Sequence, residues 1–160
     1  METRLERDSL GEVAVPAATD HAEFTPREAY GWTQGRAIYA AGVQFPPARI
    51  DGKSLIPSQA NNVYIFPAVG MAIYATQAKR VTDEMFIVAA RALADQVTKP
   101  QLEEGMLYPP QANLLDVELA TAAKVAEEIF ARGLARAERP KDVVAFIASQ
   151  AYRPRYPSFG

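Results

Sequence analysis

Apolar residues recur at three- and four-residue spacing along much of the chain, a pattern typical of amphipathic helices. The first helix is marked by a capping box at residues 25–28, where the Thr25 hydroxyl can accept from the Glu28 amide and the Glu28 carboxylate can reach back to the cap. Pro26 suits the first helical position because it has no N–H to leave unpaired. The pattern predicts a helix that begins at Pro26 and ends before Gly35.

Further helices are predicted from apolar spacing together with start and stop residues. They are expected at residues 67 to about 77, from Thr82 onward, as a single turn at 98–105, at 114–132 and at 140 to about 151. Asp83 and Glu84 follow Thr82 directly, and negative charge is favourable at the positive end of a helix dipole. We interpret these two carboxylates as solvent-exposed groups rather than as a catalytic pair, because adjacent helical residues diverge.

Two of the predicted helices carry an apolar stripe that needs a surface to pack against. One stripe consists of Phe86, Ala90, Leu93 and Val97. The other consists of Leu114, Val117, Thr121, Val125 and Ile129. A third apolar group, the aromatic residues Tyr64, Phe66 and Tyr74, is interpreted as core, because no basic residues alternate with it as they do in nucleic-acid stacking platforms.

Strand signals are sparse. Residues 36–41 form a short run bounded by glycines, which suits a strand of an open parallel sheet. Residues 42–57 read as a long loop with at most a small hairpin around Asp51-Gly52. A single parallel strand cannot satisfy its own backbone hydrogen bonds. We therefore expect either that the strand pairs with another chain or that the chain forms a mostly helical body.

Composition limits the classes of function. The chain has 160 residues, 49% of them hydrophobic and 22% charged, as expected for one soluble globular domain. A formal net charge of -2 gives no broad basic footprint for nucleic acid. No apolar run reaches the roughly 20 residues of a membrane span. The absence of cysteine excludes disulfides and thiolate sites within this sequence, and we expect a cytoplasmic protein.

The first 23 residues differ in character from the rest. Residues 3–17, TRLERDSLGEVAVPA, resemble the opening of class II fumarases and aspartases. Nothing later in the chain carries that superfamily's signature, so we expect a disordered or translocated leader at 1–23 and a separate region at 24–160. A chimera joined near residues 19–22 is the alternative reading, and with it a fumarase-like lyase activity.

Residues 35–83, GRAIYAAGVQFPPARIDGKSLIPSQANNVYIFPAVGMAIYATQAKRVTD, resemble a substrate-side segment of malic enzymes, the oxidative decarboxylases of malate. The likeness continues through Leu107-Tyr108-Pro109-Pro110 and covers roughly residues 24–159. It implies an α/β fold: the C-terminal portion of a Rossmann-like NAD(P)-binding domain, predominantly helical with one or two strands. It also implies NAD or NADP with Mg²⁺ or Mn²⁺ as the family's cofactors and malate as its substrate.

The asparagine pair Asn61-Asn62 is the strongest candidate for substrate binding. In malic enzymes the matching motif is Gly-Gln-Gly-Asn-Asn at a helix entry, and the resemblance implies that an asparagine there binds the malate carboxylate. Here the motif reads Ser58-Gln59-Ala60-Asn61-Asn62, so both glycines are replaced. Where such a glycine has positive φ, its replacement strains the turn by roughly 1 kcal/mol or more. A plain capping role for the asparagines is the alternative, and the two roles can coexist.

Gly42 and Val43 are weaker candidates for lining a cofactor site. Ligands of open α/β sheets bind beyond the carboxyl ends of strands, and these residues follow the predicted strand. The only histidine, His21, lies in the expected leader, so no histidine-based triad or zinc site can be assembled.

The acid, base, metal ligands and Gly-rich turn of malic enzymes lie upstream of the matched region in that family. We therefore predict no catalytic residue and no metal ligand in this chain, and no turnover from it alone. The alternative function is a non-enzymatic helical module that uses the faces of the helices at Thr82 and Leu114 to form a homo-oligomer or to dock on a full-length malic enzyme.

Overall fold

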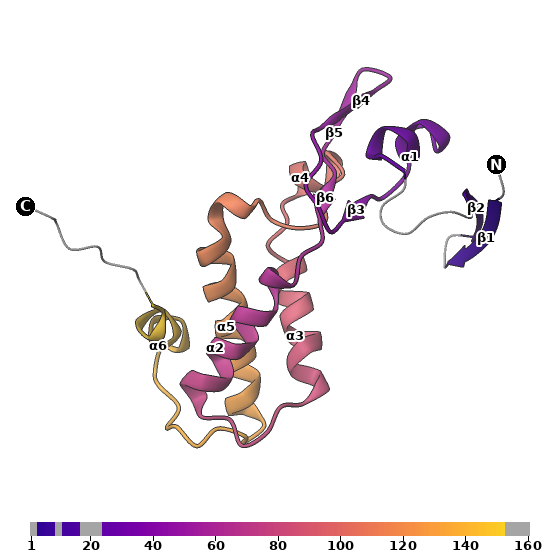
Figure 1. The fold of residues 1–160 in the computed structure, drawn as a ribbon. Helices are drawn as coiled ribbons and strands as arrows, with labels where there is room; N and C mark the ends of the chain where they lie inside the picture. Colours follow the sequence, from indigo (N-terminus) through magenta and orange to yellow (C-terminus); the bar gives the residue numbers. More distant parts are fainter. Residues whose placement is uncertain (1–2, 9–10, 17–23, 153–160) are drawn as a thin grey trace, which may run out of the picture. The chain divides into compact units, whose positions relative to one another are not determined.

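The computed structural model describes residues 3–8, 11–16 and 24–152, and the chain divides into two compact units, Met1–Ala60 and Asn61–Gly160. Strands are confined to the first unit and most helices to the second (Figure 1). The strands are β1 Thr3–Asp8, β2 Gly11–Pro16, β3 Ala40–Ala41, β4 Ala48–Ile50, β5 Lys53–Leu55 and β6 Ser58–Gln59. The helices are α1 Pro26–Trp32, η1 Asn62–Tyr64, α2 Phe66–Thr76, α3 Asp83–Ala94, α4 Lys99–Glu103, η2 Gln111–Asn113, α5 Leu114–Ala131 and α6 Val143–Gln150.

The segment expected to be a disordered leader contains a described β-hairpin. β1 pairs antiparallel with β2, with Thr3 opposite Pro16 and Asp8 opposite Gly11. The boundary at residue 23 and the disorder of the remaining leader residues stay predictions, since residues 1–2, 9–10 and 17–23 lie outside the described ranges.

The first unit builds its core from α1 and the strands that follow. The predicted capping box is present: the Thr25 amide donates to the Glu28 carboxylate at 2.7 Å, and the Glu28 amide donates to the Thr25 hydroxyl at 3.3 Å. The predicted hairpin is also present, because β4 and β5 are joined by Asp51 and Gly52 with φ of 49° and 79°. Positive φ at both central residues matches the right-handed twist of the strands, and Asp-Gly accepts it readily. The buried side chains of this core are Ala29, Tyr30, Tyr39, Ala41, Ala48 and Leu55.

The short parallel strand finds its partner within the chain, which corrects the alternative in which it pairs with another chain. Only Ala40 and Ala41 of the predicted run 36–41 are extended in a ladder, and they pair in parallel with Ser58 and Gln59 of β6. The ladder continues where the Ala60 amide donates to the Ala41 carbonyl at 2.8 Å. The intervening loop and hairpin return the chain to the same edge, so no helix is needed for this crossover.

The second unit is helical. α2 packs against α5, α6 and α3, and α5 also packs against α3 and α6. Its core is lined by small and aliphatic side chains, among them Ala68, Ala72, Met85, Ala89, Val125, Ile129 and Ile147. Alanine on facing helices lets backbones approach closely, and the larger Met85, Ile129 and Ile147 fill the remaining space with no exposure. Within the described residues no helix is both long and apolar enough to cross a membrane.

The stripe predicted on α5 is confirmed, whereas that on α3 is confirmed at Leu93 and Val97 and displaced by one residue at Phe86 and Ala90. Val117, Thr121, Val125 and Ile129 of α5 are all buried. In α3 the buried positions are Met85, Ala89, Ala92 and Leu93, while Phe86 is 47% exposed. Helix α6 begins at Val143, three residues after the expected Pro140, because the Asp142 carboxylate accepts from the Ala145 amide at 2.9 Å and sets the cap.

The C-terminal ends of α2 and α5 cap each other. The Lys79 amide donates to the Leu134 carbonyl at 2.8 Å and its ammonium donates to the Gly133 carbonyl at 3.0 Å. In return, the Arg136 amide donates to the Thr76 carbonyl at 3.1 Å, and the Arg136 guanidinium reaches the Gln77 and Ala78 carbonyls at 3.3 Å each. Two cations thus occupy the negative ends of two helix dipoles.

Candidate functional site

Asn61 caps the short helix η1 and keeps one amide group available. Its backbone is extended, with φ of -135° and ψ of 139°, and the Val63 amide donates to its Oδ1 at 3.0 Å. Because Oδ1 is the acceptor in this bond, the side-chain Nδ2 group is left as a donor. Within the described residues Nδ2 donates to no protein acceptor. The capping role that the sequence allowed is confirmed, and it still permits the side chain to donate to a ligand.

Asn62 is the first residue of η1 and is exposed. The turn that carries both asparagines is anchored by Tyr64, which is 3% exposed. The Tyr64 hydroxyl donates to the Pro109 carbonyl at 2.7 Å, and its ring stacks on Tyr108 with centroids 5.3 Å apart and an interplanar angle of 12°. Burial raises the pKa of the Tyr64 hydroxyl. Tyr64 therefore fixes the turn two residues beyond the asparagine pair.

The two replaced glycines of the asparagine motif lie in unstrained backbone. Ser58 and Ala60 are not among the described non-glycine residues with positive φ, which are Gln34, Asp51 and Gln77. Ser58 lies within β6 and Ala60 continues the ladder to Ala41. The strain considered for these replacements does not occur.

Gly42 and Val43 lie directly after β3, in the first unit. The Gln59 side-chain amide donates to the Gly42 carbonyl at 3.1 Å, which ties the ends of β3 and β6 together. Gly42 is exposed, and a Cβ placed on it would meet nothing within 4 Å. Val43 is 57% exposed. Both residues are therefore accessible at the carboxyl end of a parallel pair, while the asparagine pair begins the second unit.

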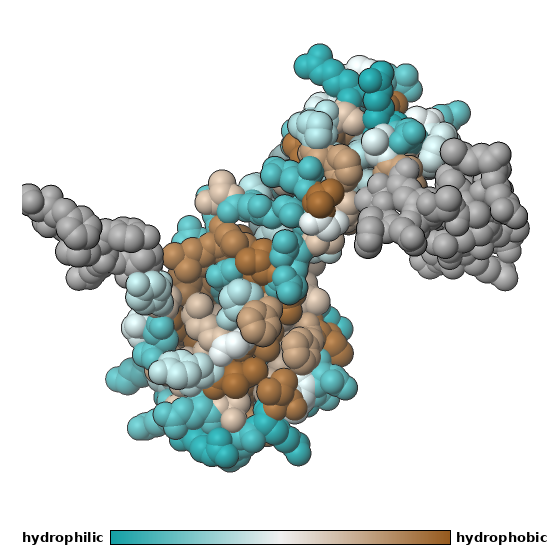
Figure 2. All heavy atoms as spheres, viewed as in Figure 1, coloured by the Kyte–Doolittle hydropathy of each residue, from teal (hydrophilic) through white to brown (hydrophobic). Residues whose placement is uncertain are grey.

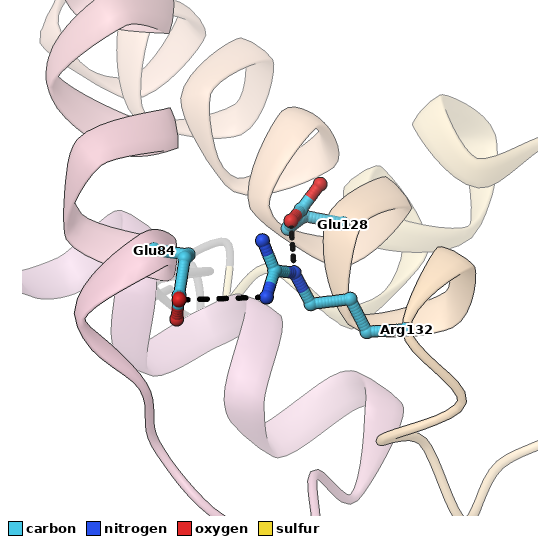
Figure 3. Close-up of polar contacts among 3 residues, drawn as sticks. All are labelled: Glu84, Glu128 and Arg132. Carbon is cyan, nitrogen blue, oxygen red and sulfur yellow. Dashed lines mark hydrogen bonds and ion pairs between the residues drawn. The ribbon is translucent and has the colours of Figure 1, made fainter.

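Acidic residues in the described part of the chain do not converge as metal ligands, and some of them pair with cations. No group of three or more His, Cys, Asp or Glu side chains there is arranged to hold a metal ion. Arg132 at the end of α5 bridges Glu128 on its own helix and Glu84 on α3, with 3.5 Å to the Glu84 carboxylate (Figure 3). The pKa of Glu84 is lowered, first by its own backbone amide at the helix start and further by the Arg132 charge. Glu84 thus has an ion partner in addition to the dipole role read from the sequence.

The sequence matches the family described as malic enzyme, NAD binding domain, over residues 13–130. This chain belongs to the malic enzyme family. The match begins eleven residues before the expected start at residue 24 and includes the asparagine pair, Gly42 and Val43.

Plant malic enzymes are among the similar proteins. The NADP-dependent malic enzyme of Vitis vinifera is 43% identical over 148 residues, covering 92% of this chain and 25% of that protein. NADP-dependent malic enzyme 3 of Arabidopsis thaliana is 44% identical over the same shares of both chains. This chain therefore spans about a quarter of the length of these relatives.

A solved malic enzyme has a related fold. The crystal structure of the Entamoeba histolytica malic enzyme superposes with a TM-score of 0.61 at 24% identity, over 80% of this chain and 24% of that one. Together with the family match, this confirms the predicted fold class: a part of a malic enzyme NAD-binding domain, about half helical with few strands.

Proposed function

We propose that this chain takes part in the oxidative decarboxylation of malate with NAD(P), in which it supplies the asparagine that binds a malate carboxylate. The observation that carries the proposal is the side chain of Asn61. Its Oδ1 is held by the Val63 amide, which orients Nδ2 as a donor on an exposed turn of a malic enzyme family chain.

A neutral amide suits this task. It donates a directional hydrogen bond to a carboxylate without neutralising the charge that must still interact with other groups of the site. The buried Tyr64 ring and its bond to the Pro109 carbonyl hold the turn, so that the amide does not have to be ordered when malate binds. The next residue, Asn62, is also exposed and provides a second side-chain amide for the same carboxylate.

The described residues fit the two family cofactors unequally. Gly42 and Val43 would line the nicotinamide side of a site, because Gly42 leaves open space and Val43 offers exposed apolar surface. When bound, the nicotinamide accepts the hydride from the malate carbon. No described cluster of acidic or histidine residues fits Mg²⁺ or Mn²⁺, so we derive no step that involves a metal from the described residues.

The chain alone should therefore bind malate weakly and should not turn it over. Calorimetric titration of malate into the purified chain tests the binding. Asn61→Ala should abolish the heat signal, and Asn61→Asp should do the same because it places a negative charge against the carboxylate.

Asn113→Ala is the matched control for this titration. Asn113 precedes α5, is exposed and makes no side-chain capping bond, so its removal should leave the signal unchanged. A signal that persists in Asn61→Ala would place malate elsewhere. Reduction of NAD or NADP that scales with the concentration of this chain would contradict the proposed lack of turnover.

The alternative function, a helical interaction module, requires exposed apolar surface on the second unit. The stripe predicted on α5 lies inside this unit, where Val125 and Ile129 are completely buried. Exposed apolar side chains are present on α3, at Phe86 and Ile87, and on α2, at Phe66 and Tyr74.

A further inference from the structure

A cleft of about 570 Å³ opens in the first unit, between the start of α1 and the segment that leads into β4. Most of its lining is apolar, and these residues are Pro26, Phe45, Pro46, Pro47 and Ala48. Sites for small molecules commonly have volumes of about 300–1,000 Å³ and a mainly apolar surface with a few polar groups. The cleft therefore has the size and the surface of a site for a small molecule.

The walls of the cleft are held in place by the fold. Pro26 and Ala48 are buried, and α1 packs against β4. The Phe45 ring packs edge-on against Tyr39, with ring centroids 5.9 Å apart and an interplanar angle of 83°. Because a proline ring fixes φ, the three prolines further restrict the backbone around the cleft. A ligand that enters a rigid cleft does not have to order it, which favours binding.

Two arginines at the cleft have no partner among the described residues. Arg27 on α1 and Arg49 on β4 both line the cleft and are exposed, and neither side chain makes a hydrogen bond or an ion pair there. Glu28, the acidic neighbour of Arg27, is occupied, because its carboxylate accepts from the Thr25 amide at 2.7 Å and from the Thr25 hydroxyl at 2.8 Å. Residues 24–60 contain four Arg or Lys and two Asp or Glu, a net charge of +2, whereas the whole chain has -2. The cleft thus carries positive charge that the described residues do not neutralise.

We propose that this cleft binds a small organic anion with a flat apolar body. The carboxylate or phosphate group of the ligand pairs with Arg27 and Arg49, and its apolar body lies against Phe45 and the prolines. A guanidinium group suits this task, because its fork of N–H donors matches the oxygens of a carboxylate or a phosphate. The prolines have no N–H to offer, so the two guanidinium groups are the charged donors of the cleft. In Figure 2 hydrophilic residues gather at the end of the β4–β5 hairpin, the strand pair that carries Arg49, with paler and brown residues next to them.

Malate is not the ligand that this cleft fits. Its short carbon chain carries two carboxylates and a hydroxyl, so it has no apolar body to cover the proline and Phe45 surface. The proposed malate contact, Asn61, belongs to the second unit, whereas every residue that lines the cleft belongs to the first. The cleft is therefore a site for a second, less polar ligand.

Fluorine NMR titration of the purified chain with small probes tests the proposal. The anionic probes are 4-fluorobenzoate and 4-fluorophenyl phosphate, and at least one of them should bind saturably. The tighter of the two shows whether the site prefers a carboxylate or a phosphate monoester. Uncharged 4-fluorobenzamide should bind at least about tenfold more weakly, because it lacks the charge-assisted hydrogen bonds. Inorganic phosphate should compete at least about tenfold more weakly than 4-fluorophenyl phosphate, because it buries no apolar surface.

Substitution of the arginines locates the anionic group. Arg27→Gln and Arg49→Gln should each raise the dissociation constant of the anionic probe at least about tenfold. Both side chains are exposed and without described partners, so the fold should be retained, which the fluorescence of Trp32 checks. Lys53→Gln is the matched control, because it removes the same charge from β5 outside the cleft and should bind like the wild type.

Three results would overturn the proposal. Failure of both anionic probes to bind at millimolar concentration would mean that the cleft is covered, by another part of a malic enzyme or by this chain itself. Unchanged binding in Arg27→Gln and Arg49→Gln would place the anion elsewhere. Equal binding of 4-fluorobenzamide or of inorganic phosphate would show that only one half of the proposed recognition exists. None of these measurements uses malate, and Asn61→Ala should bind the probes like the wild type, so they are independent of the proposed function.

Discussion

The two units of this chain hold their cores together by different kinds of contact. In the first unit, aromatic rings from separate positions in the sequence contact one another. The centroid of the Tyr39 ring lies 6.2 Å from that of Tyr30 and 5.9 Å from those of Phe24 and Phe45. The core of the second unit is aliphatic, and it is formed by helices that present alanine and branched side chains to one another. The first unit depends on a few large aromatic rings and on the hydrogen bonds of their hydroxyl groups. The second unit depends on close side-chain packing along several helical turns.

This difference bears on how each unit tolerates change. The stability of a small aromatic core depends on whether each tyrosine hydroxyl has a hydrogen-bond partner, because the free-energy cost of one unpaired hydroxyl is large compared with the stability of the unit. A packed helical core depends on volume, because every removed methylene leaves a cavity. The only tryptophan, Trp32, lies in the first unit, and most helical residues lie in the second. Fluorescence and far-ultraviolet circular dichroism therefore report on the two units separately.

The largest expected effect is on the packing of the second unit. Ile129→Ala removes a side chain with no exposure and should lower the free energy of unfolding by roughly 2–5 kcal/mol. The loss should appear in the circular dichroism transition and leave the Trp32 fluorescence transition in place. Ile87→Ala, at a position of α3 that is 50% exposed, is the control and should cost much less. Equal shifts of both transitions would show that the units unfold as one.

A pair of tyrosines should respond in opposite directions in the first unit. The Tyr39 hydroxyl donates to the Phe24 carbonyl at 2.9 Å, so Tyr39→Phe should destabilise this unit by about 1 kcal/mol. The Tyr30 hydroxyl is buried and has no hydrogen-bond partner among the described residues, so Tyr30→Phe should be neutral or stabilising. Trp32 fluorescence during denaturant unfolding measures both. If Tyr30→Phe proved as harmful as Tyr39→Phe, the Tyr30 hydroxyl would have a partner in solution.

The smallest expected effect separates the units by pH. The pKa of Glu28 is lowered by the Thr25 amide and hydroxyl, and that of Glu84 by its own amide and Arg132. A carboxylate with a lowered pKa stabilises the folded state above its unfolded pKa, and this contribution is lost as the pH falls through the folded pKa. Between about pH 6 and about pH 3, Glu28→Gln should flatten the pH dependence of the fluorescence transition only. Glu84→Gln should flatten that of the circular dichroism transition only, and the reverse assignment would contradict the division into units.

Local signals predicted most of the helices and the hairpin correctly. The capping box at Thr25, the Asp51-Gly52 turn and the stripe along α5 each depend on residues close in sequence. The pairing of β3 with β6 was missed, because a two-residue ladder between positions 40–41 and 58–59 leaves no periodic pattern. The first half of the α3 face was misjudged because Phe86 is more hydrophobic than Ala89, whereas close helix contacts select the smaller residue.

The aromatic residues around the candidate site were only partly foreseen. Tyr64 is buried as expected, but Phe66 and Tyr74 are exposed, since the inner side of α2 is taken by valine and alanine. The asparagine pair was found through its family motif, and its cap could be read from the residue type. The anchor from Tyr64 to the Pro109 carbonyl joins positions 45 residues apart, and no local pattern announces such a bond.

The reciprocal capping of α2 and α5 bears on how proteases would attack this chain. Lys79 and Arg136 are both trypsin targets, yet their amides and side chains are held by carbonyls from the other helix end. A protease needs several residues of extended, released backbone around the bond it cuts. The peptide bonds that follow Lys79 and Arg136 become accessible only when both sets of capping hydrogen bonds are broken. The two connections should therefore be nicked together, late, and as a signature that the helical unit has opened.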